Sequence, residues 1–269
     1  IFRAEKMYWF NGKLIESETI QLPINEPGLL FGATIFTTIR VYEKSLDHRL
    51  TNWEAHQKRL IYSVKNLGFQ QPSWQNIRRG TEILINNYPI IRITLFPDGK
   101  EWITGRLIPQ NLKEEQKNGV SVTIPLWSQY RSLPSHKTGN YLAPWLERKN
   151  ALQKNCREAI LTDAAGNWLE TTTGNLWGWC DECWFTPPLS TGILPGIMRE
   201  QIINWLRDHQ YQVKEQPFTN QLVQKFVSLA YTNCVVEILP IHQVIHPVVK
   251  LQYDPRHDSF KKLRRYLLA

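Results

Sequence analysis

The chain has 269 residues, of which 42% are hydrophobic and 21% charged, as expected of a folded globular protein. No apolar run approaches the ~20 residues needed to cross a bilayer, so a membrane-spanning, a disordered and a fibrous chain are all excluded. Lysine and arginine outnumber aspartate and glutamate by 32 to 24, and the resulting +8 fits nucleic-acid binding or capture of a small acidic substrate.

The first part of the chain alternates between strand and helix patterns. Asn11-Gly12 between two apolar runs predicts a β-hairpin over residues 7–16. A run of apolar residues at helical spacing ends at Gly68, a favourable helix C-cap. The further elements predicted here are a strand over 35–42, helices over 50–67 and 74–87, and a strand over 90–96. This mixture indicates a small α+β domain.

The second part is dominated by strands. Residues 111–118 are polar without apolar periodicity, which predicts a linker or the end of a surface helix. The elements predicted after it are strands over 119–125, 159–162, 168–171, 175–179, 226–232 and 235–241, and helices over 142–155, 198–208 and 260–268. The pattern therefore predicts two domains, residues 1–115 and residues 116–269.

Two of the four cysteines, Cys180 and Cys183, form a C-x-x-C pair. Such a pair is redox-active in some proteins and half of a zinc site in others, but no second pair stands at usable spacing. A hairpin turn in a reducing compartment is the favoured interpretation, and no metal site is predicted. No signal peptide is visible in residues 1–6, so a cytoplasmic protein is expected; whether those residues are native stays open.

The charge excess has one dense block, Lys261-Lys262-Leu263-Arg264-Arg265. A basic terminal helix is more often a solvated face than a nucleic-acid patch, and no nucleic-acid-binding signature accompanies this one. A small anionic substrate is therefore the expected partner, with neither nucleic acid nor membrane. A nucleic-acid-binding module driven by the charge and the tryptophans is the rival hypothesis.

Three segments have residues suited to chemistry. Lys137 stands among small polar residues before a helix, Glu170 precedes a hydroxyl-rich turn in an apolar region, and residues 192–199 form a glycine-containing loop that opens a helix. Singly, these are a surface lysine, a strand-edge acid and a helix cap. Together they form the minimal set for pyridoxal phosphate: a Schiff-base lysine, a carboxylate for the pyridine nitrogen and a helix start for the phosphate.

From Tyr8 to Ile241 the sequence resembles the fold-type IV pyridoxal-phosphate enzymes, which include branched-chain aminotransferases, D-amino-acid transaminases and 4-amino-4-deoxychorismate lyases. The resemblance implies an α+β two-domain fold, with a small α/β N-terminal domain and a larger C-terminal β-barrel-like α/β domain. It further implies a homodimer and a cofactor between the two domains. An inactive family member is a third hypothesis, against which the intact cofactor residues argue.

The resemblance assigns cofactor roles in the family's order. Lys137, in Lys-Thr-Gly-Asn-Tyr-Leu, matches the Schiff-base lysine, and Glu170, in Leu-Glu-Thr-Thr-Thr-Gly-Asn-Leu, matches the acid at the pyridine nitrogen. Arg59, in His-Gln-Lys-Arg-Leu, matches the phosphate-binding arginine. Ile197 and Met198 match the pair whose backbone N–H groups hold the phosphate.

Two further matches are less specific. Cys234, in Thr-Asn-Cys, matches a loop of small residues beside the phosphate and the substrate carboxylate. Tyr141 matches a tyrosine that hydrogen-bonds the cofactor's ring oxygen, although its spacing from the lysine varies in the family and a core position is the alternative.

Within the family, three features resemble the aminodeoxychorismate lyases: the run Phe-Gly-x-x-x-Phe-Thr-Thr-x-Arg-Val over residues 31–41, the Gly-Ile-Met-Arg loop at 196–199, and the three-residue step from Lys137 to Asn140. The implied reaction converts 4-amino-4-deoxychorismate to 4-aminobenzoate and pyruvate in folate biosynthesis, with Lys137 as catalytic base.

Other features depart from the lyases, so an aminotransferase acting on branched-chain or D-amino acids with 2-oxoglutarate stays the alternative. Phe96-Pro97-Asp98-Gly99 replaces the carboxylate-binding Arg-Gly of lyases and D-amino-acid transaminases, and Ala33-Thr34 replaces the usual Asp-Gly of the small-domain signature. Glu237 resembles the aminotransferase pattern more than the lyase pattern. The candidates to replace the missing arginine, in no order, are Arg40, Arg92, Arg106 and Arg131.

Overall fold

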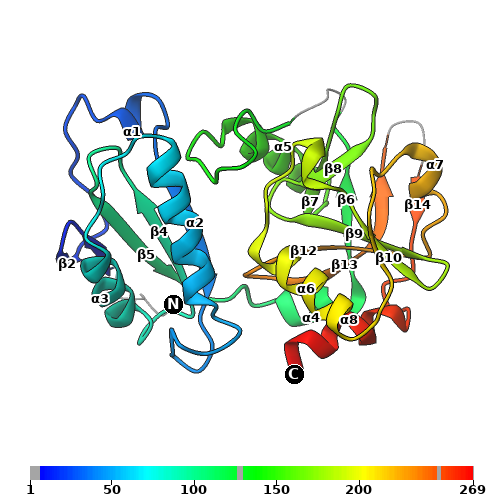
Figure 1. Ribbon diagram of the computed structural model, residues 1–269. Helices are drawn as coiled ribbons and strands as arrows, with labels where there is room; N and C mark the ends of the chain where they lie inside the picture. The colour runs from blue at the N-terminus through cyan, green and yellow to red at the C-terminus, as the bar shows by residue number, and fades with distance from the viewer. Residues whose placement is uncertain (1–6, 126–129, 247–249, 269) are drawn as a thin grey trace. The chain divides into compact units, whose positions relative to one another are not determined.

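The computed structural model describes residues 7–125, 130–246 and 250–268. These residues form two compact units: the first runs up to Pro109 and includes His136–Tyr141, and the second contains the rest (Figure 1). The predicted division into domains at residues 115 and 116 stays a prediction. The units follow spatial contacts, and for that reason a short segment beyond the division groups with the first unit.

A five-stranded antiparallel sheet organises the first unit, in the order β2-β1-β5-β4-β3. Its elements are β1 (Met7–Phe10), β2 (Lys13–Glu16), α1 (Pro27–Leu30), β3 (Ile35–Arg40), α2 (Trp53–Asn66), α3 (Trp74–Leu84), β4 (Ile90–Leu95) and β5 (Glu101–Arg106). The predicted β1–β2 hairpin is confirmed, since Asn11 and Gly12 both have the positive φ that its two-residue turn requires.

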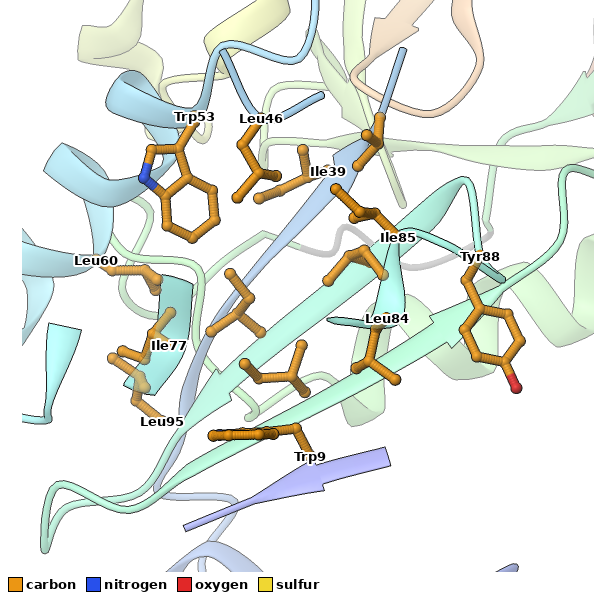
Figure 2. Packing of buried hydrophobic residues seen from close by; sticks show 14 of the residues in the cluster. Trp9, Ile39, Leu46, Trp53, Leu60, Ile77, Leu84, Ile85, Tyr88 and Leu95 are labelled. Carbon is orange, nitrogen blue, oxygen red and sulfur yellow. The ribbon is translucent and has the colours of Figure 1, made fainter. Parts of the chain in front are cut away.

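One face of this sheet is covered by α2 and α3 and is apolar. Alternate strand residues point into it, and they pack against Leu60, Ile77 and Leu84 from the helices (Figure 2). Trp9 closes the end of this core, where a side chain at Gly80 of α3 would collide with the indole ring. The opposite face of the sheet is therefore the one left for polar residues.

The second unit is built on nine strands of one sheet. Its elements are α4 (Leu112–Asn118), β6 (Val120–Thr123), α5 (Leu142–Gln153), β7 (Glu158–Thr162), β8 (Trp168–Thr171), β9 (Asn175–Cys180), β10 (Cys183–Thr186), a 3₁₀ turn (Leu189–Thr191), α6 (Ile197–Asp208), β11 (Val213–Glu215), α7 (Asn220–Val223), β12 (Ser228–Asn233), β13 (Glu237–Ile245), β14 (Lys250–Gln252) and α8 (Ser259–Leu268).

Six of these strands close into a barrel. The path β9-β12-β13-β6-β7-β8 returns to β9 through the pairing of Glu170 with Asn175. Helix α4 packs on β13, α5 on β7 and α6 on β12, while α8 packs against α6. The predicted fold class, a small α/β unit followed by a larger barrel-like α/β unit, is confirmed.

Two local predictions have clear outcomes. Residues 111–118, expected to be a linker or a helix end, contain the helix α4, whose single buried residue is Leu112. Cys180 and Cys183 lie opposite each other across the turn between β9 and β10, as free thiols. Asp181 and Glu182 take the positive φ values of a two-residue hairpin turn, in agreement with the hairpin interpretation. No helix in the described ranges combines the length and apolarity of a membrane span.

Candidate active site

Lys137 belongs to a segment that pairs with β3. Its carbonyl oxygen accepts a hydrogen bond from the N–H of Phe36 at 2.8 Å, and the N–H of Gly139 donates to the carbonyl of Thr34 at 2.7 Å. A side chain at Gly139 would meet the Thr34 hydroxyl at 2.1 Å, so the close approach of the two segments requires glycine. The backbone of Lys137 is thereby fixed to the sheet.

The Lys137 ammonium lies over aromatic rings. Its Nζ is 4.8 Å from the centre of the Phe36 ring and 5.9 Å from that of Tyr141. These two rings meet edge to face at 6.0 Å. The Arg92 guanidinium lies 3.6 Å from the centre of the same Phe36 ring. One phenylalanine thus contacts both the candidate catalytic amine and a guanidinium through cation–π interactions.

Arg92 belongs to a group of arginines on the polar face of the sheet. Arg40 and Arg106 are both paired with Ile90, and Arg92 is two residues further along the same strand, so all three lie on one face. Burial lowers the pKa of Arg92 to about 10, with Arg106 acting in the same direction and Tyr141 against it. This face therefore holds a concentration of positive charge, as an anionic ligand requires.

Arg59 is held by a short polar chain on the helix-covered face. Its Nη2 donates to the Thr37 hydroxyl, and that hydroxyl lies 2.6 Å from Nδ1 of His56. Since Thr37 accepts from the arginine, its own proton points to His56, whose ring then accepts at Nδ1. His56 is buried, and its pKa is well below the ordinary value because of burial, then Arg59, then Lys137. A neutral histidine thus orients Arg59 through Thr37.

Glu170, in the second unit, is a buried carboxylate paired with an arginine. Arg131 Nε donates to its Oε1 at 2.6 Å, and the N–H of Leu194 approaches the same oxygen at 3.4 Å. The side chains of Glu170 and Arg131 are 3% and 7% exposed. A guanidinium this close favours the ionised carboxylate over the acid. Arg131, one of four candidates for binding a substrate carboxylate, is therefore engaged by Glu170.

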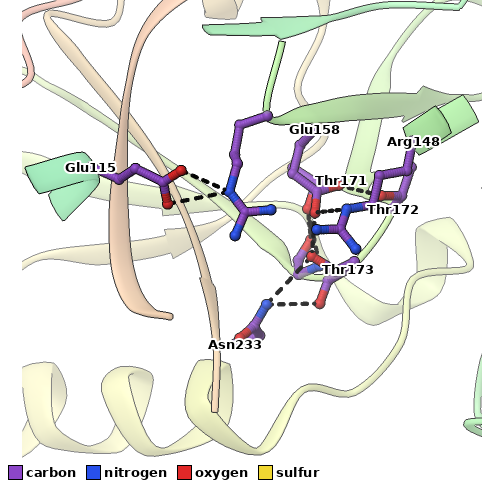
Figure 3. A network of polar contacts seen from close by, with 9 residues as sticks. Glu115, Arg148, Glu158, Thr171, Thr172, Thr173 and Asn233 are labelled. Atoms are coloured by element: carbon purple, nitrogen blue, oxygen red, sulfur yellow. Dashed lines mark hydrogen bonds and ion pairs between the residues drawn. The ribbon is translucent and has the colours of Figure 1, made fainter. Parts of the chain in front are cut away.

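A second buried carboxylate holds the turn that follows Glu170. Glu158 accepts from the hydroxyls of Thr172 and Thr173 and lies 3.4 Å from Nε of Arg148 (Figure 3). Burial raises its pKa, and Arg148 and the two hydroxyls oppose that rise. Asn233 donates to Thr173 from the neighbouring strand β12. The turn between β8 and β9 is thereby fixed from two sides.

Helix α6 begins at Ile197, and its N-cap residue, Gly196, has no side chain with which to cap the first turn. Asn175 Nδ2 donates to the carbonyl of Leu194 at 2.9 Å, which holds the loop before the helix. A Cβ at Gly196, the N-cap, would come within 2.0 Å of Asn175 Oδ1, so the loop needs glycine there. An uncapped helix start offers N–H donors and a partial positive charge to an anion.

Cys234 lies in a tight turn between β12 and β13. The Asn233 side chain accepts from the N–H groups of Val235 and Val236, both at 2.9 Å, and so fixes the backbone on either side of Cys234. The Cys234 side chain is half-buried. Because Asn233 also donates to Thr173, this turn and the turn after Glu170 form one polar assembly within the barrel.

The predicted site residues therefore fall into two sets, each described inside its own unit. Lys137, Arg59 and Tyr141 belong to the first unit, and the second contains Glu170, Ile197, Met198 and Cys234. Sequence reasoning assigned no role to His56, Thr37, Glu158 and Asn175. His56 stands in the same helical turn as Arg59, and Asn175 follows Glu170 by five residues, so their proximity was the available signal.

The donor chemistry of the two sets fits pyridoxal phosphate. The start of α6, with a glycine N-cap, suits a phosphate, the buried carboxylate of Glu170 beside Arg131 suits a pyridinium nitrogen, and Lys137 provides a primary amine. The described residues contain no group of three histidine, cysteine or acidic side chains suited to a metal ion. Fold and donor chemistry together are those of a pyridoxal-phosphate enzyme.

Comparison with known proteins agrees. The model of amino-transferase class IV matches residues 34–244. The branched-chain-amino-acid aminotransferase of Escherichia coli K12 is 26% identical over 263 residues, covering 88% of this chain and 84% of that enzyme. The aminodeoxychorismate lyase of Vibrio harveyi is 22% identical over 270 residues, covering 92% and 94%. The chain belongs to the class IV aminotransferase family.

Solved structures show the same fold. A hypothetical aminotransferase from Mycobacterium tuberculosis, in its PLP-bound form, superposes with a TM-score of 0.78 at 17% identity, covering 96% of each chain. The resemblance to fold-type IV enzymes is confirmed, and the cofactor is pyridoxal phosphate. The protein is thus an enzyme of this family.

Proposed function

We propose that the enzyme is a lyase that converts 4-amino-4-deoxychorismate to 4-aminobenzoate and pyruvate. The observation that supports this most is the arginine-bearing sheet face beside Lys137. The substrate has two carboxylates, and Arg92 with Arg40 and Arg106 offers more than one guanidinium to bind them. Thr38, Thr94 and Thr104 stand on the same face, which favours a polar substrate over an aliphatic one.

Arg92 is the first choice among the candidates for the substrate carboxylate. It shares the Phe36 ring with Lys137, whereas Arg131 is engaged by Glu170 and Arg106 is exposed. A half-buried guanidinium binds a carboxylate more strongly than an exposed one because water screens it less. Arg92 therefore replaces the missing arginine of the Phe96-Pro97-Asp98-Gly99 turn.

The remaining roles follow the family resemblance. Lys137 would hold the cofactor covalently through Nζ, and the same amine, once free, would remove the proton from substrate C4. When bound, pyridoxal phosphate supplies an electron sink for that step. Glu170, kept ionised by Arg131, holds the pyridine nitrogen in its protonated form. Tyr141 donates its hydroxyl proton to the cofactor's ring oxygen.

The family resemblance assigns the phosphate roles residue by residue. Arg59, oriented by Thr37, offers a guanidinium, and the N–H groups of Ile197 and Met198 offer the start of α6. Cys234 lines the phosphate and carboxylate end through its turn. None of these groups needs a change of protonation to bind a phosphate dianion.

The second candidate is an aminotransferase acting on branched-chain or D-amino acids with 2-oxoglutarate. The observation that favours it is the higher identity to the Escherichia coli branched-chain enzyme, 26% against 22% for the Vibrio harveyi lyase. In that case Arg92 would bind the α-carboxylate shared by amino acid and oxo acid, and Lys137 would remove the proton from the α-carbon of the amino acid.

The decisive experiment incubates the cofactor-loaded enzyme with 4-amino-4-deoxychorismate and measures 4-aminobenzoate and pyruvate. Equal amounts of the two products support the lyase. A parallel incubation with isoleucine or D-alanine and 2-oxoglutarate measures glutamate. Glutamate formation without 4-aminobenzoate overturns the lyase and supports the aminotransferase.

Cofactor attachment is tested separately from substrate choice. Borohydride reduction of the loaded enzyme, followed by peptide mass analysis, is expected to find the cofactor mass on the peptide that contains Lys137. Lys58, exposed on α2 and paired with Glu54, serves as the internal control for nonspecific lysine labelling. Label on another lysine in place of Lys137 contradicts the assignment.

The proposal includes a homodimer and a cytoplasmic location. Large apolar side chains are exposed in both units, among them Leu29 and Phe31 of the first and Leu142 and Trp145 of the second, as expected of surfaces that a partner covers. The cytoplasmic location rests on the sequence, in which the C-x-x-C pair forms a hairpin turn and not a metal site. Light scattering during gel filtration tests the dimer, since a monomer mass contradicts it.

A further inference from the structure

A hollow of about 430 Å³ opens on the second unit between α4, the turn around Pro255 and α8. Five cationic side chains line it, and none of its described lining residues is acidic. The cations are Lys113, Lys117, Arg256, Lys261 and Arg264. Two of them, Lys261 and Arg264, come from the basic block 261–265, to which the proposed reaction assigns no role.

Most of this charge faces no carboxylate. Arg256 Nη2 donates to the side-chain oxygen of Asn118 at 2.9 Å, and Arg264 Nη2 donates to the main-chain oxygen of Gln116 at 2.6 Å. Both acceptors are uncharged. Within the described part of the chain, Lys261 is the one cation of the five that forms an ion pair, with Asp258 at 2.7 Å.

Capping of α4 explains only part of this arrangement. Arg256 and Arg264 reach the end of that helix, where main-chain and side-chain oxygens lack helical partners. Lys117 lies in the last turn of α4, where a positive charge is favourable, whereas Lys113 stands four residues before it as a like charge. Burial lowers the pKa of Arg264, against the influence of Glu237. A bound anion would offset both the burial of Arg264 and the clustering of like charge.

We propose that this hollow is a binding site for a small polyphosphate anion. Two adjacent phosphates bring three to four negative charges into a compact space, a number similar to that of the positive charges that line the hollow. The aromatic residue of the lining, Phe260, is buried, so the stacking platform typical of single-stranded nucleic-acid sites is missing from the described lining. A compact anion therefore fits better than an extended strand.

The site has a direct connection to the candidate cofactor residues. Gln116, part of the lining, donates from Nε2 to the main-chain oxygen of Val236 and to Glu237 Oε2, both at 2.9 Å. Val236 belongs to the turn that holds Cys234, and Arg264 holds the main chain of Gln116. An anion that shifts Arg264 therefore affects the backbone of the Cys234 turn through Gln116.

Calorimetric titration of the full-length, cofactor-loaded enzyme with pyrophosphate at low ionic strength tests the proposal. Loading the enzyme first fills the cofactor's phosphate-binding site, so pyrophosphate does not bind there during the titration. One saturable site per chain is expected. The double variant Lys117→Gln/Arg256→Gln is expected to bind at least about tenfold more weakly, since each charge-assisted contact contributes about that much. Both side chains are exposed, and Arg264 and Gln116 stay intact.

The matched control is Lys154→Gln/Lys225→Gln, which removes two exposed charges from the same unit outside the hollow. Its affinity for pyrophosphate is expected to equal that of the unaltered enzyme within about twofold. Absence of saturable binding, or equal weakening in both double variants, overturns the proposal. So does a single-stranded RNA oligomer that binds more tightly than pyrophosphate and loses affinity with the first double variant.

Discussion

The polar face of the sheet in the first unit and the barrel of the second unit differ in the sign of their characteristic charged groups. On the sheet face the charged groups beside Lys137 are cations, and both Lys137 and Arg92 lie over the Phe36 ring. In the barrel the buried charges are carboxylates, and both Glu158 and Glu170 face an arginine. We infer that the first unit binds anionic groups of substrate and cofactor, while the barrel keeps a fixed carboxylate at the pyridine nitrogen.

Among the cations of the first unit, replacement of Lys137 is expected to cause the largest loss of activity. Lys137→Ala removes the amine that bonds the cofactor and moves the proton, so kcat is expected to fall by about 10³-fold or more. Steady-state formation of 4-aminobenzoate measures the loss, or glutamate formation if the aminotransferase is correct. Lys58→Ala, at an exposed ion pair, controls for removal of a lysine. A Lys137→Ala enzyme with more than a tenth of the original activity refutes the assigned role.

Glu158 tests the carboxylate side. Glu158→Ala leaves the two threonine hydroxyls without their acceptor and half-exposed Arg148 without its partner, so the free energy of unfolding is expected to drop by about 1–3 kcal/mol. Urea denaturation measures it. Glu158→Gln keeps an oxygen for the hydroxyls, and we expect it to lose less than half as much. Equal losses in the two variants are inconsistent with an acceptor role.

How far the sequence predicts this contrast depends on the range of the contacts. Lys137, Glu170 and Arg59 stand in recognisable local motifs, and the hairpin at Asn11-Gly12 follows from two turn residues. The pairing of Arg131 with Glu170 spans 39 residues and leaves no local pattern.

Two elements show the same limit. Residues 101–106, with a glycine and three polar residues, lack the continuous β-branched run that predicts a strand; pairing on both sides, with β1 and β4, makes them β5. Helix α4 buries only Leu112, so it has too few apolar residues for a helical period to be visible. In both cases tertiary contacts, rather than local preference, determine the structure.

Arg92 tests whether the cations of the first unit bind the substrate carboxylate. Arg92→Gln removes the half-buried guanidinium beside Phe36, and kcat/KM is expected to fall about 10–100-fold, mainly through KM, since a hydrogen bond to a charged group contributes about 1.5–3 kcal/mol. Initial rates over a range of substrate concentrations separate KM from kcat. Arg79→Gln, exposed on α3, is the matched control. An unchanged KM excludes Arg92 from carboxylate binding.

His56 is expected to give the smallest effect, a change in how stability depends on pH. It is the neutral group that orients Arg59 through Thr37. In the unfolded chain its pKa returns to about 6.5, whereas in the folded chain burial, Arg59 and Lys137 keep the pKa well below that value. Below about pH 6.5 the unfolded chain binds a proton that the folded chain does not. The free energy of unfolding therefore falls as the pH is lowered, by up to about 1.4 kcal/mol per pH unit.

The variant His56→Asn isolates this contribution. Asparagine retains an oxygen that accepts from Thr37 but does not titrate, so this part of the pH dependence is expected to vanish while the anchor of Arg59 persists. Urea denaturation at a series of pH values from about 7 to 5 measures both slopes, with His209→Asn, at an exposed position, controlling for loss of a histidine. Identical slopes for His56→Asn and the unaltered enzyme mean that the pKa of His56 is the same in the folded and unfolded chains, which contradicts a histidine kept neutral by burial.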